Sequence, residues 1–255
     1  MTDSAPIIRA CHGIAELEGC VSLQKEVWNF DDVDLIPLRL FVVATKIGGQ
    51  VIGAFDGNEL IGFAMSIPGT RSGNPYLHSH MLAVRESFRN TGLGRKLKLA
   101  QRDDALGRSI RLIEWTFDPL EIRNAWLNIE RLGAIARRYN PNQYGMSSSP
   151  LQGGLPTDRL VAEWWLDSRR VESVLAGKSP SAKIDERIEV PASIYEMKKS
   201  GDPRAKQIQG SNRTAFQQAF ARGLAVLRYE RDAEMNGSFL LGRWDEDLSF
   251  GSSET

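Results

Sequence analysis

A strand, a glycine-containing turn and a helix follow one another directly between residues 76 and 106. The run YLHSHMLAV at 76–84 is typical of a strand, and leucines and alanines recur near one helical face from 92 to 106. Gly92 and Gly94 lie at the junction. Such glycines let the main chain approach a ligand closely, and successive N–H groups at a helix start can converge on a diphosphate. A tight turn without a ligand has the same composition, so both interpretations stay open at this point.

Two phosphate-binding patterns do not fit this turn. A nucleoside-triphosphate loop ends in Gly-Lys-Ser/Thr, and a dinucleotide fingerprint has a third glycine three residues after the second. The chain has neither, and Arg89 instead precedes Gly92 by three residues. Any diphosphate site here is therefore of another kind.

The residues before the turn predict two helices and the first strands of a sheet. A strand is expected at 7–11, a helix at 13–28, and a second helix that Pro37 opens and Gly48 ends. Residues 50–67 then read as two strands joined at Asp56-Gly57-Asn58, where glycine accepts the positive φ that a hairpin requires.

The residues after the turn predict a strand at 110–117, a helix at 120–133 and closing strands at 134–139 and 159–166. The fold class is therefore α/β, or α+β, with helices packed on a mixed sheet.

The last third of the chain has a weaker pattern. Residues 177–183 read as a linker, and a strand, two helices and a hairpin are expected beyond it, with a frayed tail from 245 onward. We expect one domain at 1–167 and a C-terminal α+β extension at 168–255.

The stretch LAVRESFRNTGLGRKL resembles the acyl-CoA-binding segment of the GNAT N-acetyltransferase superfamily. In that segment a strand ending in valine is followed by Arg/Gln-x-x-Gly-x-Gly/Ala, and the order of elements over about residues 5–167 agrees with the family fold. The six matching positions are Arg89, Asn90, Thr91, Gly92, Leu93 and Gly94.

The resemblance implies acetyl-CoA or another acyl-CoA as co-substrate. Main-chain amides of the turn, up to Arg95, would bind the pyrophosphate. The pantetheine would pair with the edge of the preceding strand at Leu82, Ala83 and Val84. Asn124 could also contact the pantetheine. An N–H near Val84 would donate to the thioester oxygen.

The resemblance also implies a base on the preceding strand, where relatives often have a glutamate. This chain has His78 and His80 there, and strict alternation would place them on one face with Leu82 and Val84. Structural histidines are the alternative, and His78 is the preferred base of the two. Asp118 could orient the amine or act as base, or it could be a solvated strand end.

Many relatives have a tyrosine as general acid four residues before a conserved-looking glycine, and this chain has Ile129 at that position. Tyr139 or Tyr144 could replace it, or both could be packing residues. Asp158, Arg159 and Trp164 could line an acceptor pocket, or Trp164 and Trp165 could fill the core.

Composition excludes some partners. Thirty-two basic residues balance thirty-two acidic ones, so no overall field favours nucleic acid or an anionic membrane. Cys11 and Cys20 have no further ligand at metal-binding spacing, so no metal is expected, and buried thiols are favoured over a nucleophile or a disulfide. The start lacks the pattern of a leader, which predicts a cytoplasmic protein.

The predicted function is transfer of an acetyl or other acyl group from acyl-CoA to the amine of a small molecule or peptide. The alternative is a CoA-binding protein with a regulatory or structural task and little turnover, because the usual tyrosine and glutamate are missing. The extension could cover the acceptor side, form an interaction module or support a homodimer. The sequence leaves the acceptor open.

Overall fold

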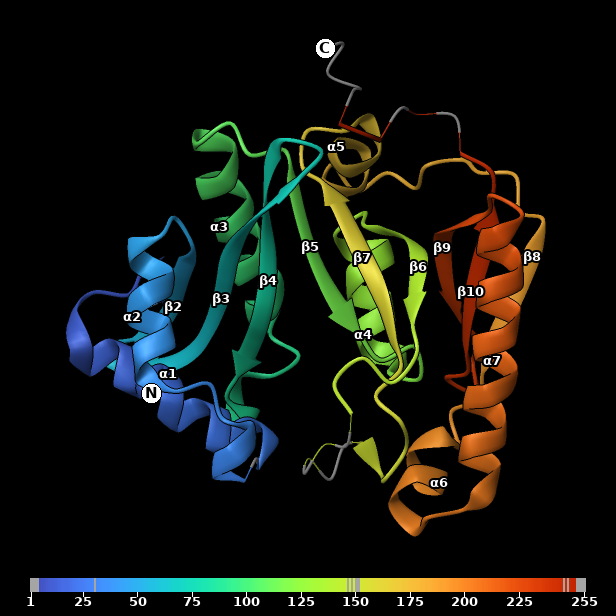
Figure 1. Cartoon of the computed structure of the whole chain (residues 1–255), viewed down its shortest axis with the longest axis horizontal. Helices are drawn as coiled ribbons and strands as arrows, with labels where there is room; N and C mark the ends of the chain where they lie inside the picture. Colours follow the sequence, from blue (N-terminus) through green and yellow to red (C-terminus); the bar gives the residue numbers. More distant parts are fainter. Residues whose placement is uncertain are drawn as a thin grey trace. The chain divides into compact units, whose positions relative to one another are not determined.

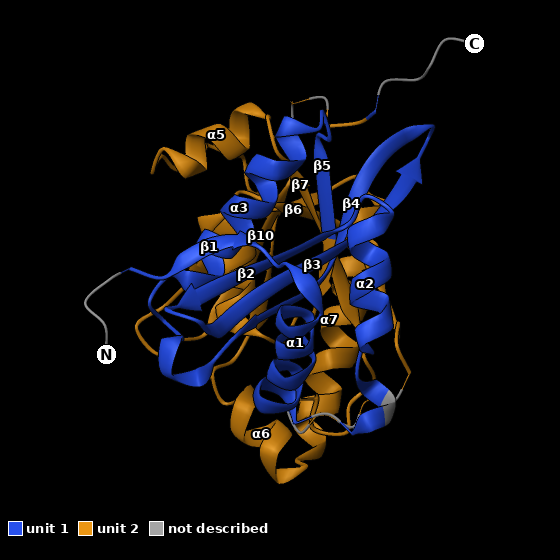
Figure 2. Ribbon diagram, turned by 90° about the vertical axis from the view of Figure 1, so that its left-hand side faces the viewer, with its two compact units in different colours: residues 1–114, 250–255 blue, residues 115–249 orange. Residues whose placement is uncertain are grey.

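We describe the protein from a computed structural model, shown in Figure 1. Two compact units divide the chain, coloured separately in Figure 2: unit 1 comprises residues 1–114 and 250–255, and unit 2 comprises residues 115–249. The residues described are 5–29, 31–145, 147, 149, 152–244, 246 and 248–250.

Unit 1 is a sheet with helices on both faces. The strand order is β1-β2-β3-β4-β5, antiparallel except for the parallel pair β4–β5. Its elements are β1 (Ile7–Ala10), α1 (Gly13–Trp28), η1 (Asp32–Asp34), α2 (Leu38–Lys46), β2 (Gln50–Asp56), β3 (Glu59–Arg71), β4 (Asn74–Val84), η2 (Glu86–Phe88), α3 (Leu93–Gly107) and the first part of β5 (Leu112–Phe117).

Two hydrophobic clusters hold these helices to the sheet. One joins α1 and α2 to the sheet and contains Phe41 and Phe63, whose rings meet edge to face at 5.7 Å between centroids. The other lies under α3 and contains Leu93, Leu97 and Ala64. The helix after the glycine turn is therefore anchored by its apolar face, and its first residues reach the end of β4.

Strand β4 contains a bulge at His80. Met81 pairs with Met65 of β3, whereas Ser79 pairs with Ser66, so His80 is an extra residue without an opposite partner in β3. A bulge of this kind reverses the alternation of side chains along the strand.

Unit 2 contains the last part of β5 and five further strands in the order β7-β6-β9-β10-β8. Its other elements are α4 (Ile122–Trp126), the π-helical turn η3 (Leu127–Arg131), β6 (Ile135–Asn140), β7 (Arg159–Trp165), α5 (Arg169–Leu175), β8 (Glu186–Val190), α6 (Ile194–Ser200), α7 (Pro203–Ala221), β9 (Ala225–Arg231) and β10 (Gly237–Gly242).

Most expected elements are present, including the turn at Gly57 and the helix that begins beside Pro37. The sequence missed α5, a short helix, and the π-helical character of η3. The frayed tail from 245 falls largely outside the described residues. The division at residue 167 stays a prediction. In the sequence, the boundary between the two compact units falls after Glu114, within β5. Among the residues described, no helix is both long and apolar enough to cross a bilayer.

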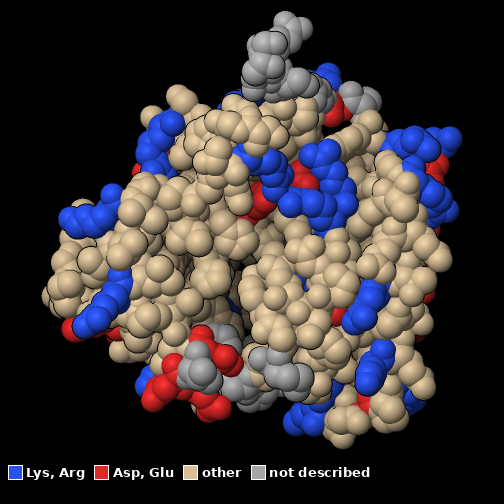
Figure 3. All heavy atoms as spheres, viewed as in Figure 1, with Lys and Arg blue, Asp and Glu red and all other residues tan. Residues whose placement is uncertain are grey.

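Charged side chains of both signs are scattered over the face seen in Figure 3, and the described residues form no continuous basic surface there. The mixed distribution is consistent with the equal numbers of basic and acidic residues in the sequence.

Candidate active site

The glycine turn leaves a row of main-chain amides without acceptors. Gly92 caps α3 with a φ of +84°, a left-handed conformation that favours glycine, and no side chain caps the helix start. The first bond of the helix runs from Lys96 N to Gly92 O. Four consecutive amides therefore donate to no acceptor among the described residues, those of Thr91, Gly92, Leu93 and Gly94.

The space beside this turn is open. A side-chain atom added at Gly92 would meet no atom within 4 Å, and one at Gly94 would only touch Leu82 and Val84 at 3.8 and 3.9 Å. Packing alone therefore does not require glycine at position 94. A ligand that approaches the main chain would explain it.

Positive charge adjoins these amides. Arg89 and Lys96 are exposed, and neither has a carboxylate partner among the residues described. Arg89 Nε donates to Val84 O at 3.2 Å, which holds its guanidinium beside the end of β4. Arg85 is not available in the same way, because Glu26 and Glu59 both pair with it. The helix dipole adds partial positive charge at the same point.

The end of β4 offers a free main-chain edge. Arg85 N donates to Ile61 O of β3, so the N–H groups of Leu82 and Val84 point away from β3 by the alternation of an extended strand. In the described part of unit 1, β5 pairs with β4 only at Leu77 and His78. Leu82 and Val84 thus direct their N–H groups away from β3, on the side where Val84 O accepts from Arg89 Nε, whereas the main chain of Ala83 faces β3.

The bulge corrects one expectation about the histidines. Ser79 lies opposite Ser66 and Leu82 lies opposite Ala64 on the α3 face, whereas His78 lies opposite Ile67 on the α1–α2 face. His78 therefore does not share a face with Leu82 and Val84. Strict alternation failed because one extra residue was inserted between them.

His80 is the residue at the bulge itself. It is half-buried, and burial lowers its pKa below the ordinary value. Its ring lies 6.0 Å from that of His78, centroid to centroid. His80 is therefore neutral at neutral pH and can accept a proton.

Asp118 belongs to unit 2 and forms a buried ion pair. Its carboxylate accepts hydrogen bonds from Leu120 N at 2.8 Å and from Lys198 Nζ at 3.1 Å. Asn124 is exposed on α4, and Ile129 is completely buried in η3. The turn residues and both histidines lie in unit 1. Asp118, Asn124 and Ile129 lie in unit 2.

The remaining polar candidates are engaged elsewhere. Tyr139 donates to the buried Asp158, which Arg213 also pairs with, and Trp164 is buried with its N–H bonded to Leu132 O. Asp158 and Trp164 are therefore core residues. Tyr144 is exposed and shares a hydrogen bond with Thr116 at 2.8 Å.

Both cysteines are free and buried in the described structure, which agrees with the expectation of buried thiols. No group of three or more His, Cys, Asp or Glu residues suited to a metal ion occurs in the described ranges.

Sequence reasoning missed a buried polar network under α3. Lys98 Nζ donates to Ser79 Oγ at 2.7 Å, Ser79 donates to Gln101 Oε1 at 3.0 Å, and Gln50 donates to Gln101 O at 2.8 Å. Burial lowers the pKa of Lys98 well below its ordinary value. Lys98 and Gln101 stand among leucines on α3, and their polar character predicts a position facing solvent. The contact with Ser79 depends on the bulge, which turns Ser79 toward α3.

Comparison with known proteins finds one family model that matches part of the chain. The family model for acetyltransferases of the GNAT family matches residues 15–125. Residues 15–125 are therefore similar to the acetyltransferases of this family. No curated protein matches the sequence.

Solved structures show the same fold. The ribosomal-protein-S18-alanine N-acetyltransferase of Escherichia coli is 13% identical, with a TM-score of 0.51 over 64% of this chain and 95% of that one. The yncA structure of Salmonella typhimurium, determined with its cofactor acetyl-CoA, is 16% identical, with a TM-score of 0.52 over 65% and 96%. Arabidopsis thaliana NAA60, in complex with a bisubstrate analogue, is 14% identical, with a TM-score of 0.51 over 63% and 97%. This protein thus has a GNAT-like fold with a C-terminal extension.

Proposed function

We propose that the protein is an N-acyltransferase that moves an acetyl or other acyl group from acyl-CoA to the amine of an acceptor. The observation that carries this proposal is the row of four amides without acceptors at the start of α3, beside Arg89 and Lys96. A diphosphate supplies acceptors for several such amides at once, and the two cations offset its charge.

The edge of β4 would hold the rest of the co-substrate. The N–H groups of Leu82 and Val84 point away from β3, where an extended pantetheine arm can pair with them as a further strand would. An N–H there donates to the thioester oxygen, where negative charge develops as the amine attacks. Holding the thioester and amine together supplies much of the remaining rate.

We assign the base to His80 in preference to His78. Its imidazole is neutral at neutral pH because burial lowers its pKa, and it lies on β4 where the bulge interrupts the ladder. The amine nitrogen forms a bond to the carbonyl carbon and gives its proton to His80. The C–S bond then breaks, and the imidazolium can return that proton to sulfur. One group would thus serve both tasks, since Ile129 cannot act as an acid.

Asp118 is the second candidate for base. Its carboxylate is already paired with Lys198 and accepts a hydrogen bond from Leu120 N, which makes His80 the better choice.

A matched pair of glycine variants of the full chain tests the co-substrate site. Gly94→Leu and Gly107→Leu both lie on α3, and neither added side-chain atom meets a close contact in the protein. Titration calorimetry with acetyl-CoA should detect binding to the wild type and to Gly107→Leu, with loss of binding in Gly94→Leu at an unchanged melting temperature. Equal binding in both variants would exclude the site.

A CoA-binding protein with little turnover is the second candidate, favoured by Ile129 at the usual tyrosine position. Release of free CoA thiol across a panel of amines separates the two. Bound acetyl-CoA without amine-dependent thiol release would support this alternative.

A further inference from the structure

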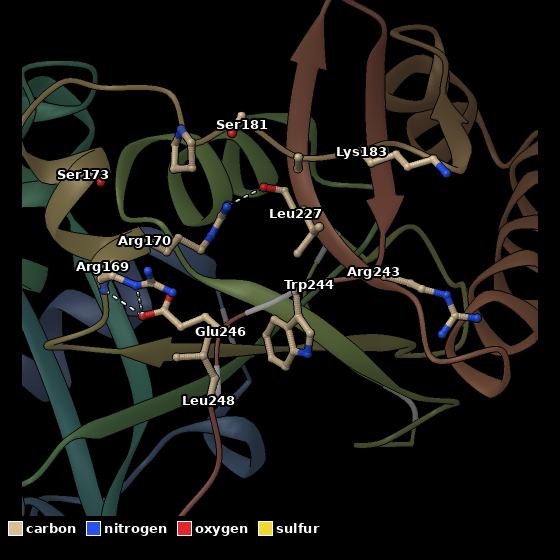
Figure 4. Close-up of a pocket in the computed structure, with 12 residues that line it drawn as sticks. Arg169, Arg170, Ser173, Ser181, Lys183, Leu227, Arg243, Trp244, Glu246 and Leu248 are labelled. Carbon is tan, nitrogen blue, oxygen red and sulfur yellow. Dashed lines mark hydrogen bonds and ion pairs between the residues drawn. The ribbon is translucent and has the colours of Figure 1, made fainter.

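A cavity of about 720 Å³ in unit 2 is lined by several cations, but their side chains do not converge on one point. Arg170 already donates to two main-chain carbonyl groups, and Lys183 and Arg243 point away from it (Figure 4). Polar side chains of unit 1, by contrast, meet at a single buried hydroxyl group beside the bulge of β4.

This buried network adjoins the bulge on the side of α3. Lys98 Nζ donates to Ser79 Oγ at 2.7 Å, and Ser79 Oγ donates to Gln101 Oε1 at 3.0 Å. All three residues are buried. Ser79 is the last residue of β4 that pairs with β3 before the extra residue, His80. Two side chains of α3 therefore hold the residue at which the bulge begins.

The opposite strand is tied to the same helix. Ser66 of β3, which pairs with Ser79, donates to Gln50 Oε1 at 2.8 Å. Gln50 Nε2 in turn donates to Gln101 O at 2.8 Å and to Asp104 Oδ2 at 2.7 Å, both on α3. Both serines at the register shift are thus connected to α3 through hydrogen bonds.

The network favours the bulged register over a regular one. A regular β4 would place His80 opposite Ser66, in the position that Ser79 occupies in the bulged strand. Lys98 and Gln101 would then lose the hydroxyl group that they bind. Buried donors and acceptors without partners are costly, so a polar network in the interior specifies one arrangement of the strand.

We propose that Ser79 and Lys98 are positioning residues for the acyl transfer, because their hydrogen bond under α3 fixes the bulge of β4 and thereby the place of the His80 imidazole. This inference rests on the proposed function, in which His80 is the base. Both residues are buried and act through the main chain of β4. The four free amides at the start of α3 take no part in the network, so binding of acetyl-CoA should not depend on it.

NMR of isotope-labelled histidine in the full chain tests the position of His80 without any need for turnover. The chain has three histidines, so their imidazole signals can be assigned from single glutamine substitutions. In Ser79→Ala the bulge loses its anchor, and the titration midpoint of His80 should shift by about half a pH unit or more. Ser79→Thr keeps the hydroxyl group and should retain the wild-type midpoint. Equal shifts in the two variants would contradict the role of the hydroxyl group.

Lys98→Met provides the second variant, because it removes the donor on α3 without a change next to His80. Ser79→Ala keeps the charge of Lys98, so a shift common to both variants does not come from lost charge. Lys46→Met is the matched control, since Lys46 is exposed on α2, and it should leave the His80 midpoint unchanged. A wild-type midpoint in both Ser79→Ala and Lys98→Met would overturn the proposal.

Kinetics separate positioning from an effect on co-substrate binding. Ser79→Ala and Lys98→Met should lower kcat about ten- to a hundredfold with the KM for acetyl-CoA unchanged, because a small displacement of the base is enough to slow the chemical step. Ser79→Thr should recover most of kcat. A raised KM with an unchanged kcat would contradict the positioning role. If the wild type releases no CoA thiol with any amine, the proposed function fails, and the NMR comparison alone decides whether the network fixes the bulge.

Discussion

The ammonium of Lys198 on α6 lies 3.1 Å from the carboxylate of Asp118, the residue that follows β5. A second carboxylate, that of Glu121, lies 2.9 Å from the same nitrogen. Burial by itself lowers the pKa of Lys198, but the two acids outweigh it and raise the pKa above the ordinary value. The cluster therefore ties the extension to the end of β5 within unit 2.

Lys198→Met should destabilise the protein, because it leaves two carboxylates near each other without a cation. Breaking a buried ion pair on one side costs about 3–5 kcal/mol of unfolding free energy. Lys199→Met is the control, since Lys199 is exposed and should change stability by no more than about 0.5 kcal/mol. Urea unfolding followed by tryptophan fluorescence measures the unfolding free energy of both variants. Equal decreases in the two variants would show that the ion pairs of Lys198 do not stabilise the protein.

His80→Gln should lower turnover about 10²–10⁴-fold if His80 is the base, with acetyl-CoA affinity unchanged. His78→Gln should have a smaller effect. In the wild type, activity should fall on the acid side as His80 becomes protonated, and because burial lowers the pKa that fall should lie below pH 6.5. Rates measured from pH 5 to 8 test this, and an acid limb that persists in His80→Gln would assign it to another group.

The double variant Arg89→Gln/Lys96→Gln should raise the KM for acetyl-CoA roughly two- to tenfold with little change in kcat. Both side chains are exposed beside the free amides, so we expect them to act on binding of the diphosphate and not on the chemical step. Lys46→Gln, at an exposed position on α2, is the control. The salt dependence of KM should weaken in the double variant only. An unchanged KM would show that the charges of Arg89 and Lys96 do not contribute to binding of acetyl-CoA.

Lys98→Met should flatten the pH dependence of stability on the alkaline side. The pKa of Lys98 is lowered in the folded protein, so the unfolded chain binds its proton more strongly between the lowered pKa and 10.5. Lys98 therefore makes the unfolding free energy rise with pH across that window. Subtracting the curve of Lys98→Met from that of the wild type isolates this contribution, and a flat difference would mean that Lys98 titrates normally.

Local patterns were sufficient for most elements. Gly57 marked the hairpin, Pro37 the start of α2, and Gly92 the start of α3, because each favours one backbone geometry wherever it occurs. The family motif at Arg89–Gly94 was readable for the same reason, since its chemistry lies in consecutive main-chain groups. By contrast α5 is only seven residues long and left too short a periodic signal.

The side-chain environment was not readable in this way. Nothing in YLHSHMLAV marks His80 as the extra residue, because a bulge is defined by the register of the neighbouring strand β3. Likewise Asp118 gains its cation from Lys198, eighty residues further along the chain.

The sequence by itself determined the order of elements, the glycine turn and the family to which that turn is related, since these depend on neighbours along the chain. Only the tertiary structure decided which face His78 occupies and which two acids pair with Lys198. Those relationships depend on strand register and on contacts between distant segments, where the free energy comes from burial and charge pairing.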